Sequence, residues 1–156
     1  VLSLTQSLPS RAEIIEQSRI VREAQRLIIH NHPYGRNTWM AIIRDLPNQN
    51  LELTYEGDAF PSEDFLDLMR NWLEHGRPIG TTFWFAIREE ATGIKILKTI
   101  EEVLGAHRVC DQKINILMNN GLQLTISFHK VQGVIVPIEK WKNDYATRWF
   151  LKMKAV

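Results

Sequence analysis

The residues with types and spacing suited to chemistry are few, and the first group contains two imidazoles. His30 and His32 are separated by one residue in the segment His30-Asn31-His32-Pro33. Imidazoles at this spacing can share a zinc ion, but the pair supplies only two of the ligands that such a site needs. We therefore interpret the segment as a polar turn after a helix, where His30 favours the negative end of the helix dipole. Only this pair keeps a metal-dependent enzyme open as a hypothesis.

The second group surrounds the single cysteine. Cys110 stands next to Asp111 and near His107, and a cysteine–histidine pair can act in nucleophilic catalysis. Nothing in the local sequence marks the pair as catalytic, and one cysteine excludes an internal disulfide. The glycine-containing segment 76–80 includes a proline and leads into a predicted strand, so it does not resemble a phosphate-binding loop. We therefore predict no catalytic residue, no metal site, no cofactor and no enzymatic activity.

The charged residues indicate binding through local surface patches, not through the net charge of the whole molecule. Nineteen Lys and Arg against eighteen Asp and Glu give the 156 residues a formal net charge of +1. This balance excludes binding to nucleic acid or membrane through overall charge alone. Arg19, Arg22 and Arg26 form one candidate contact for anions, because their spacings of three and four residues place them on one side of a predicted helix. Interleaved glutamates also favour a solvated, salt-bridged helix face there.

A second candidate surface lies near the C-terminus, where residues 140–154 are predicted to form a helix. Its basic residues outnumber its acidic residues, and its aromatic residues recur every four positions. This combination suits an interfacial membrane contact or stacking with single-stranded nucleic acid. A terminal helix packed on the sheet is the alternative, and we favour it. The predicted contacts for anions, membrane or nucleic acid are Lys140, Lys142, Arg148, Lys152 and Lys154, and the predicted aromatic surface is Trp141, Tyr145 and Trp149.

The elements that position these residues are predicted from hydrophobic periodicity. Residues 1–9 are expected to be a flexible arm, followed by one domain over 10–156. The predicted helices cover 10–29, 61–76, 93–104 and 140–154, the predicted strands cover 51–56, 81–88 and 133–138, and 38–46 fits a strand or a short helix. Asn120-Gly121 predicts a hairpin between 114–118 and 122–128, because both residue types tolerate positive φ. The fold class is therefore α+β, with a mainly antiparallel sheet packed with helices.

This order of elements resembles the globular domain of rhabdovirus matrix proteins. The resemblance rests on four stretches that cover about half of the chain. The first is the strand 50–57, which leads through Phe60-Pro61-Ser62 into a helix ending in Asn71-Trp72-Leu73. The other three are the strand 82–88, the hairpin 114–128 and the segment Val136-Pro137-Ile138-Glu139-Lys140-Trp141. None of these stretches is a catalytic signature.

The resemblance implies a viral structural protein of the virion that polymerises under the membrane and condenses the nucleocapsid. Its partners would be further copies of itself, the anionic membrane surface, the ribonucleoprotein and a host protein. Its location would be the virion and the host cytoplasm or the inner face of the membrane, and the sequence shows no signal peptide or membrane-spanning segment. The basic N-terminal segment and proline-rich motif of such proteins have no counterpart in residues 1–9. The alternative is a nucleic-acid-binding or host-interaction accessory module.

Overall fold

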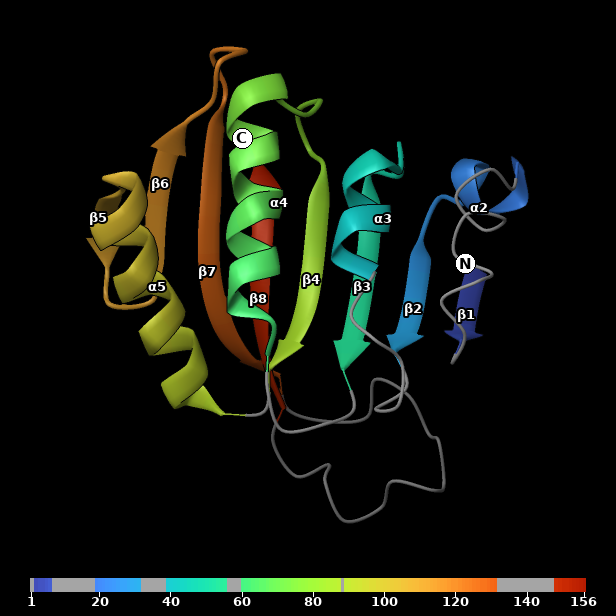
Figure 1. Ribbon diagram of the computed structural model, residues 1–156, viewed down its shortest axis with the longest axis horizontal. Coiled ribbons are helices and arrows are strands. Elements are labelled where there is room, and N and C mark those ends of the chain that lie inside the picture. Colours follow the sequence, from blue (N-terminus) through green and yellow to red (C-terminus); the bar gives the residue numbers. More distant parts are fainter. Residues whose placement is uncertain (1, 7–18, 32–38, 56–59, 88, 132–147) are drawn as a thin grey trace.

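One mixed sheet organises the chain. The computed structural model describes residues 2–6, 19–31, 39–55, 60–87, 89–131 and 148–156. Eight strands form the sheet in the order β1-β2-β3-β4-β8-β7-β6-β5 (Figure 1). The pairing direction changes once, between β4 and β8, so the sheet has a parallel half and an antiparallel half.

The parallel half contains the first four strands of the sequence. They are β1 (Leu2–Gln6), β2 (Leu27–Asn31), β3 (Asn50–Tyr55) and β4 (Thr82–Ile87). Each pairs in parallel with the next. Parallel neighbours need long connections, and these connections contain α2 (Arg19–Glu23), α3 (Trp39–Asp45) and α4 (Ser62–His75).

The antiparallel half is built around β8 (Arg148–Ala155), which lies between β4 and β7 (Gln123–Val131). β6 (Lys113–Leu117) pairs with β7, and β5 (His107–Cys110) forms the edge. The last helix, α5 (Glu90–Leu104), connects the two halves in the sequence, since it follows β4 and precedes β5. The last described strand thus occupies the centre of the sheet.

Helices α3, α4 and α5 lie on the same face of the sheet (Figure 1). The core is the layer between these helices and that face. Along β4 the exposure alternates, so that Phe83, Phe85 and Ile87 are buried under the helices and the residues between them are not. Phe65 and Trp72 of α4 pack edge to face on Phe85 and Phe83, with ring centroids 5.2 and 5.0 Å apart. Aromatic pairs in this geometry add to the stabilisation from burial.

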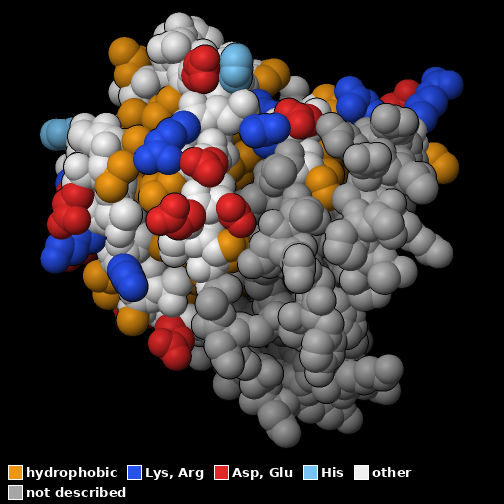
Figure 2. All heavy atoms as spheres, in the orientation of Figure 1, with side chains coloured by type: hydrophobic (Ala, Val, Ile, Leu, Met, Phe, Trp, Pro, Cys, Tyr) orange, Lys and Arg blue, Asp and Glu red, His pale blue; other side chains and the backbone are white. Residues whose placement is uncertain are grey.

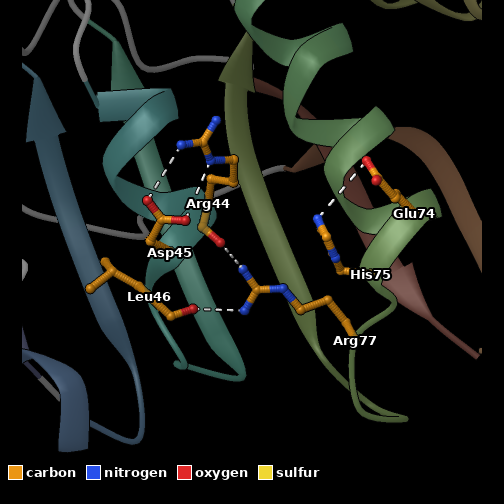
Figure 3. Close-up of polar contacts among 6 residues, drawn as sticks. All are labelled: Arg44, Asp45, Leu46, Glu74, His75 and Arg77. Carbon is orange, nitrogen blue, oxygen red and sulfur yellow. Dashed lines mark hydrogen bonds and ion pairs between the residues drawn. The ribbon is translucent and has the colours of Figure 1, made fainter.

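Arg77 joins the end of α3 to the start of β4. Its guanidinium donates hydrogen bonds to the backbone carbonyls of Arg44 and Leu46, the latter at 2.7 Å, and so satisfies acceptors at the C-terminal end of α3 (Figure 3). The same guanidinium lies 5.4 Å from the ring centroids of both Trp72 and Phe83. Burial lowers the pKa of Arg77 and the charge of Asp45 opposes that shift. The Arg77 side chain therefore has a structural role, since all its described contacts lie within the fold.

The predicted fold class is confirmed: the protein is α+β, with four of its seven strand pairings antiparallel. The hairpin is also confirmed, because β6 and β7 pair across a turn in which Gly121 has φ +85°. The strand–helix–strand order over residues 50–87 is as predicted, and 39–45 is the short helix of the two alternatives. The parallel half has no counterpart in the sequence-based prediction. Residues 133–138 lie outside the described part of the chain.

The prediction for the first thirty residues is wrong in two places. Residues 2–6 form strand β1, not a flexible arm, because they pair with β2 along their whole length. The helix predicted over 10–29 ends at Glu23, and Leu27–Asn31 is a strand. Leu27, Ile28 and Ile29 are all at most 9% exposed, as in a strand buried on both faces. Such a strand is a continuous apolar run, which short-range periodicity does not distinguish from a helix. Residues 10–18 lie outside the described part.

The helix predicted over 140–154 is also wrong from residue 148 onward, where the chain forms β8. Leu151, Met153 and Ala155 are fully buried, while Lys152 and Lys154 between them are partly exposed. This alternation has the period of a strand. Among the described helices, none is long and apolar enough to cross a membrane.

Candidate functional site

On β4 to β8, the face of the sheet turned away from α3, α4 and α5 brings lysines from different strands together. In one row, the register places Trp84 opposite Lys152, Lys152 opposite Ser127, and Ser127 opposite Lys113. Residues paired in register share a face of the sheet. We call the resulting surface the lysine face, and it consists of Trp84, Lys113, Thr125, Ser127, His129, Lys152 and Lys154.

Strand geometry sets the spacing of the three lysines. Lys152 and Lys154 are two residues apart on β8, which corresponds to about 7 Å. Lys113 lies two strands from Lys152, which corresponds to about 10 Å. Lys113 and His129 are exposed, and Lys152 and Lys154 are partly exposed. The cations are thus spread over a surface a few nucleotides or lipid headgroups wide, not gathered at one point.

The charges of the two faces differ. The five strands β4 to β8 contain no Asp or Glu. The helices on the other face are acidic, and Figure 2 shows Asp and Glu side chains gathered over α4 on that side. Their carboxylates are Glu63, Asp64, Asp67, Glu74, Glu90, Glu101 and Glu102, against Arg70, Lys95 and Lys98. Although the net charge is only +1, positive charge is concentrated on the lysine face and negative charge on the helices of the opposite face.

Trp84 holds the central lysine in place. The Lys152 ammonium lies 4.8 Å from the centroid of the Trp84 ring, within the range of a cation–π contact. Phe150 and His129 flank the same ring, each with its centroid 6.3 Å away. Ser127 Oγ and His129 Nε2 are 2.7 Å apart, which is hydrogen-bonding distance. The lysine face is consequently a connected set of side chains.

The lysines and the histidine affect one another's protonation. Burial and then the charges of Lys154 and Lys113 lower the pKa of Lys152. Burial and then the charges of Lys152 and Lys113 lower the pKa of His129. None of the seven residues of the lysine face carries a carboxylate, and Glu52, which the register places opposite Trp84, is buried and forms an ion pair with Arg26. An anion bound here would relieve it, because opposite charges favour the protonated forms.

The structure separates the three arginines that the sequence suggested as one stripe. Arg19 forms an ion pair with Glu23 of α2 at 2.7 Å, and both side chains are largely exposed. Arg26 lies beyond the end of α2 and forms an ion pair at 3.1 Å with Glu52, which is 6% exposed. Arg22 lies on α2 and lines a pocket described below. These arginines therefore belong to different environments.

The C-terminal candidates are divided between the two faces. Lys152 and Lys154 lie on the lysine face, whereas Trp149 packs on Phe128 on the helix side, with ring centroids 5.7 Å apart. Arg148 is the first residue of β8. Lys140, Trp141, Lys142 and Tyr145 lie outside the described part of the chain. Their predicted contacts therefore stay predictions.

Sequence reasoning missed five of the seven members of the lysine face: Trp84, Lys113, Thr125, Ser127 and His129. The alternation in β7 already places His129 and Ser127 on one side of the hairpin, and the Asn120-Gly121 turn fixes the register that adds Lys113. What was missing was the pairing of β8 with β7 and β4, which joins residues far apart in the sequence. A strand assignment for 148–155 would have supplied part of that signal.

Where they are described, the residues considered for metal or nucleophilic chemistry lie on two strands, His30 on β2 and both His107 and Cys110 on β5. His30 belongs to β2, and His32 lies outside the described residues. No three His, Cys, Asp or Glu residues among those described are placed to hold a metal ion. Cys110 is exposed on the edge strand β5.

Fold and site together define an α+β protein whose mixed sheet has helices on one face and a lysine-bearing surface on the other. The chain belongs to the family described as "Domain of unknown function (DUF3557)", whose model matches residues 5–89, more than half of its length. No curated protein matches the chain, and no solved structure does. The matched segment ends just after β4, so Lys113, His129, Lys152 and Lys154 lie beyond it.

Proposed function

We propose that the protein is a non-enzymatic binding protein and that its lysine face binds single-stranded nucleic acid. The observation that carries the proposal is the row of cations on strands that contain no Asp or Glu. Phosphates contribute most of the affinity in such complexes, and lysines neutralise them without reading sequence. The roughly 7 Å spacing along β8 gives two cations to an extended chain of phosphates.

Single strands fit this surface better than duplexes do. An extended chain can lie across several strands of an open sheet face, and His129 offers a flat ring at its surface. The Trp84 ring already holds the Lys152 ammonium, so its role is to position a cation. The hydroxyls of Ser127 and Thr125 already contact His129 Nε2 and Asn115 Oδ1, so the lysines supply the contacts to phosphate oxygens.

The matrix-type role implied by the resemblance is the second candidate. It includes a contact with ribonucleoprotein, for which the lysine face is suited, and it adds a contact with anionic lipid and association of copies at the inner face of a membrane. Val109 and Leu117 near the edge strand β5 are 49% and 69% exposed, and they favour self-association there. This role stays a prediction, as does its viral setting.

Fluorescence anisotropy tests the proposal, with the full chain and a labelled single-stranded oligonucleotide of about 15 nucleotides. The double variant Lys152→Gln/Lys154→Gln should bind at least about tenfold more weakly, and the salt slope should fall by about 1.4, since each single-strand phosphate contact contributes about 0.7. The matched control is Lys95→Gln/Lys98→Gln on α5, which removes the same charge from the other face.

Two results would overturn this assignment. One is the absence of binding to the oligonucleotide, and the other is an equal loss in the control and in the β8 variant. Vesicles with and without anionic lipid form a parallel arm. The matrix-type role would replace nucleic-acid binding if two results occur together: the unaltered protein does not bind the oligonucleotide, and Lys152→Gln/Lys154→Gln weakens binding to vesicles.

A further inference from the structure

A polar pocket opens at one end of the lysine face. It has a volume of about 440 Å³, within the usual range for ligand sites. It lies where β3 and β4 begin, beside α2. The pocket is lined by Arg22, Ala24, Gln25, Pro47, Asn48, Gln49, Asn50, Gly80 and Thr82.

The pocket and the lysine face are continuous. The register places Asn50 opposite Thr82 and Thr82 opposite Lys154, so one row of side chains runs from the pocket wall to the lysine. The backbone N–H of Gly80 donates to the carbonyl of Ala155 at 2.9 Å, which fixes the pocket rim to the end of β8. A nucleic-acid chain whose phosphates contact Lys152 and Lys154 along β8 would therefore reach the pocket.

The chemistry of the lining differs from that of the lysine face. Four of the lining residues carry carboxamides, Gln25, Asn48, Gln49 and Asn50, and one, Arg22, carries a guanidinium; the Asn48 amide already donates within the fold. Carboxamides present a donor and an acceptor side by side, and this pair matches the edge of a nucleobase, adenine above all. Phosphate alone would not make use of the acceptors.

One acceptor in the wall lacks a donor. Asn48 is 3% exposed, and its Nδ2 donates to the carbonyls of Val21 and Ala24 at 2.8 and 3.0 Å. These two bonds fix the orientation of the amide. Its Oδ1 is buried and has no hydrogen-bond partner among the described residues. Because this oxygen has almost no accessible surface, a ligand in the pocket would instead meet the exposed amides of Gln25, Gln49 and Asn50.

We propose that this pocket is a base-binding subsite, which takes one nucleobase of a strand whose phosphates lie on the lysine face. The inference rests on the proposed function, because it places the base of the same ligand. The lysines supply affinity for any phosphate chain, and the pocket distinguishes a chain with bases from one without them. Adenine fits best, because its amino group and ring nitrogen match a carboxamide.

The test compares two labelled probes with the same phosphates: an oligodeoxyadenylate and an abasic deoxyribose-phosphate oligomer of equal length. The unaltered protein should bind the adenine probe about tenfold more tightly. The variant Gln25→Ala/Gln49→Ala should lose this preference while binding the abasic probe as before. Both side chains are exposed, so the variant is expected to fold, and circular dichroism checks this. Gln112→Ala, in an exposed turn outside the pocket, is the matched control.

The outcomes separate the two proposals. Equal binding of the two probes by the unaltered protein overturns the subsite, and so does a preference that survives in Gln25→Ala/Gln49→Ala. In both cases the lysine face still binds phosphate. If neither probe binds at all, nucleic-acid binding itself is wrong. Lys152→Gln/Lys154→Gln should weaken both probes by the same factor, and a selective loss of the adenine probe in that variant would also contradict the division of roles.

Discussion

The two faces of the sheet use the same strands for different purposes. On the helix side, β4 presents Phe83, Phe85 and Ile87 to a closely packed aromatic and aliphatic core. On the other side, the same strand presents Trp84, which holds a lysine. The helices over the first face are rich in carboxylates, and the second face has none on β4 to β8. Alternation along one strand thus places the core side chains on one face and the proposed binding surface on the other.

The largest expected effect comes from a pair of neighbours in β4. Phe85→Ala should lower the free energy of unfolding by about 3–5 kcal/mol, because the ring is fully buried against Phe60 and Phe65. Trp84→Ala should cost only about 1–2 kcal/mol, because a partly exposed ring buries less apolar area. Urea denaturation measures both. Equal losses of unfolding free energy would mean that the two faces contribute equally to stability, which would contradict the difference between the faces.

A smaller effect tests how closely the helix layer sits on the sheet. A Cβ added at Gly93 of α5 would stand 2.7 Å from Cγ of Phe128 on β7. Alanine is a better helix former than glycine by about 0.5–1 kcal/mol. Overpacking costs about 1–3 kcal/mol, so Gly93→Ala should destabilise the protein by about 1 kcal/mol. In a double-mutant cycle with Phe128→Leu, the cost should shrink, and an unchanged cost would contradict close contact at this point.

The smallest effect concerns the lysine face. The pKa of His129 lies below its ordinary value because of burial first, and then the charges of Lys152 and Lys113. NMR titration of the imidazole protons should therefore show a rise of this pKa in Lys152→Gln and no change in Lys98→Gln. Because the folded state disfavours the protonated ring, the stabilising contribution of His129 is present above the unfolded pKa. It is lost as the pH falls from there through the folded pKa. An unchanged His129 pKa in Lys152→Gln would show that the two groups are not coupled.

The sequence allowed prediction of the elements whose signals are local. The hairpin at Asn120-Gly121 and the amphipathic helix α4 follow from turn chemistry and from periodicity, and both are confirmed. β2 was assigned to a helix because its apolar run is buried on both faces, as happens in the parallel half of a sheet. β1 was missed because its partner had been misassigned.

The candidate site was less predictable than the fold for a physical reason. Lys152 and Lys154 were recognised as basic residues, but their position beside Trp84 and Lys113 depends on strand pairings over long sequence distances. The pocket depends on them too, since α2, β3 and β4 each contribute to its lining. Composition predicts which residues are charged, whereas only register decides which charges share a surface.

The position of β8 has a consequence for how the molecule is made. This strand is synthesised after the other seven, yet it must insert between β4 and β7. Until it does, a nascent chain on the ribosome carries two incomplete sheets with open, apolar edges, and contacts of such long range form slowly. Newly made copies are then exposed to mispairing with one another, and chaperones would bind them in the interval before β8 is in place.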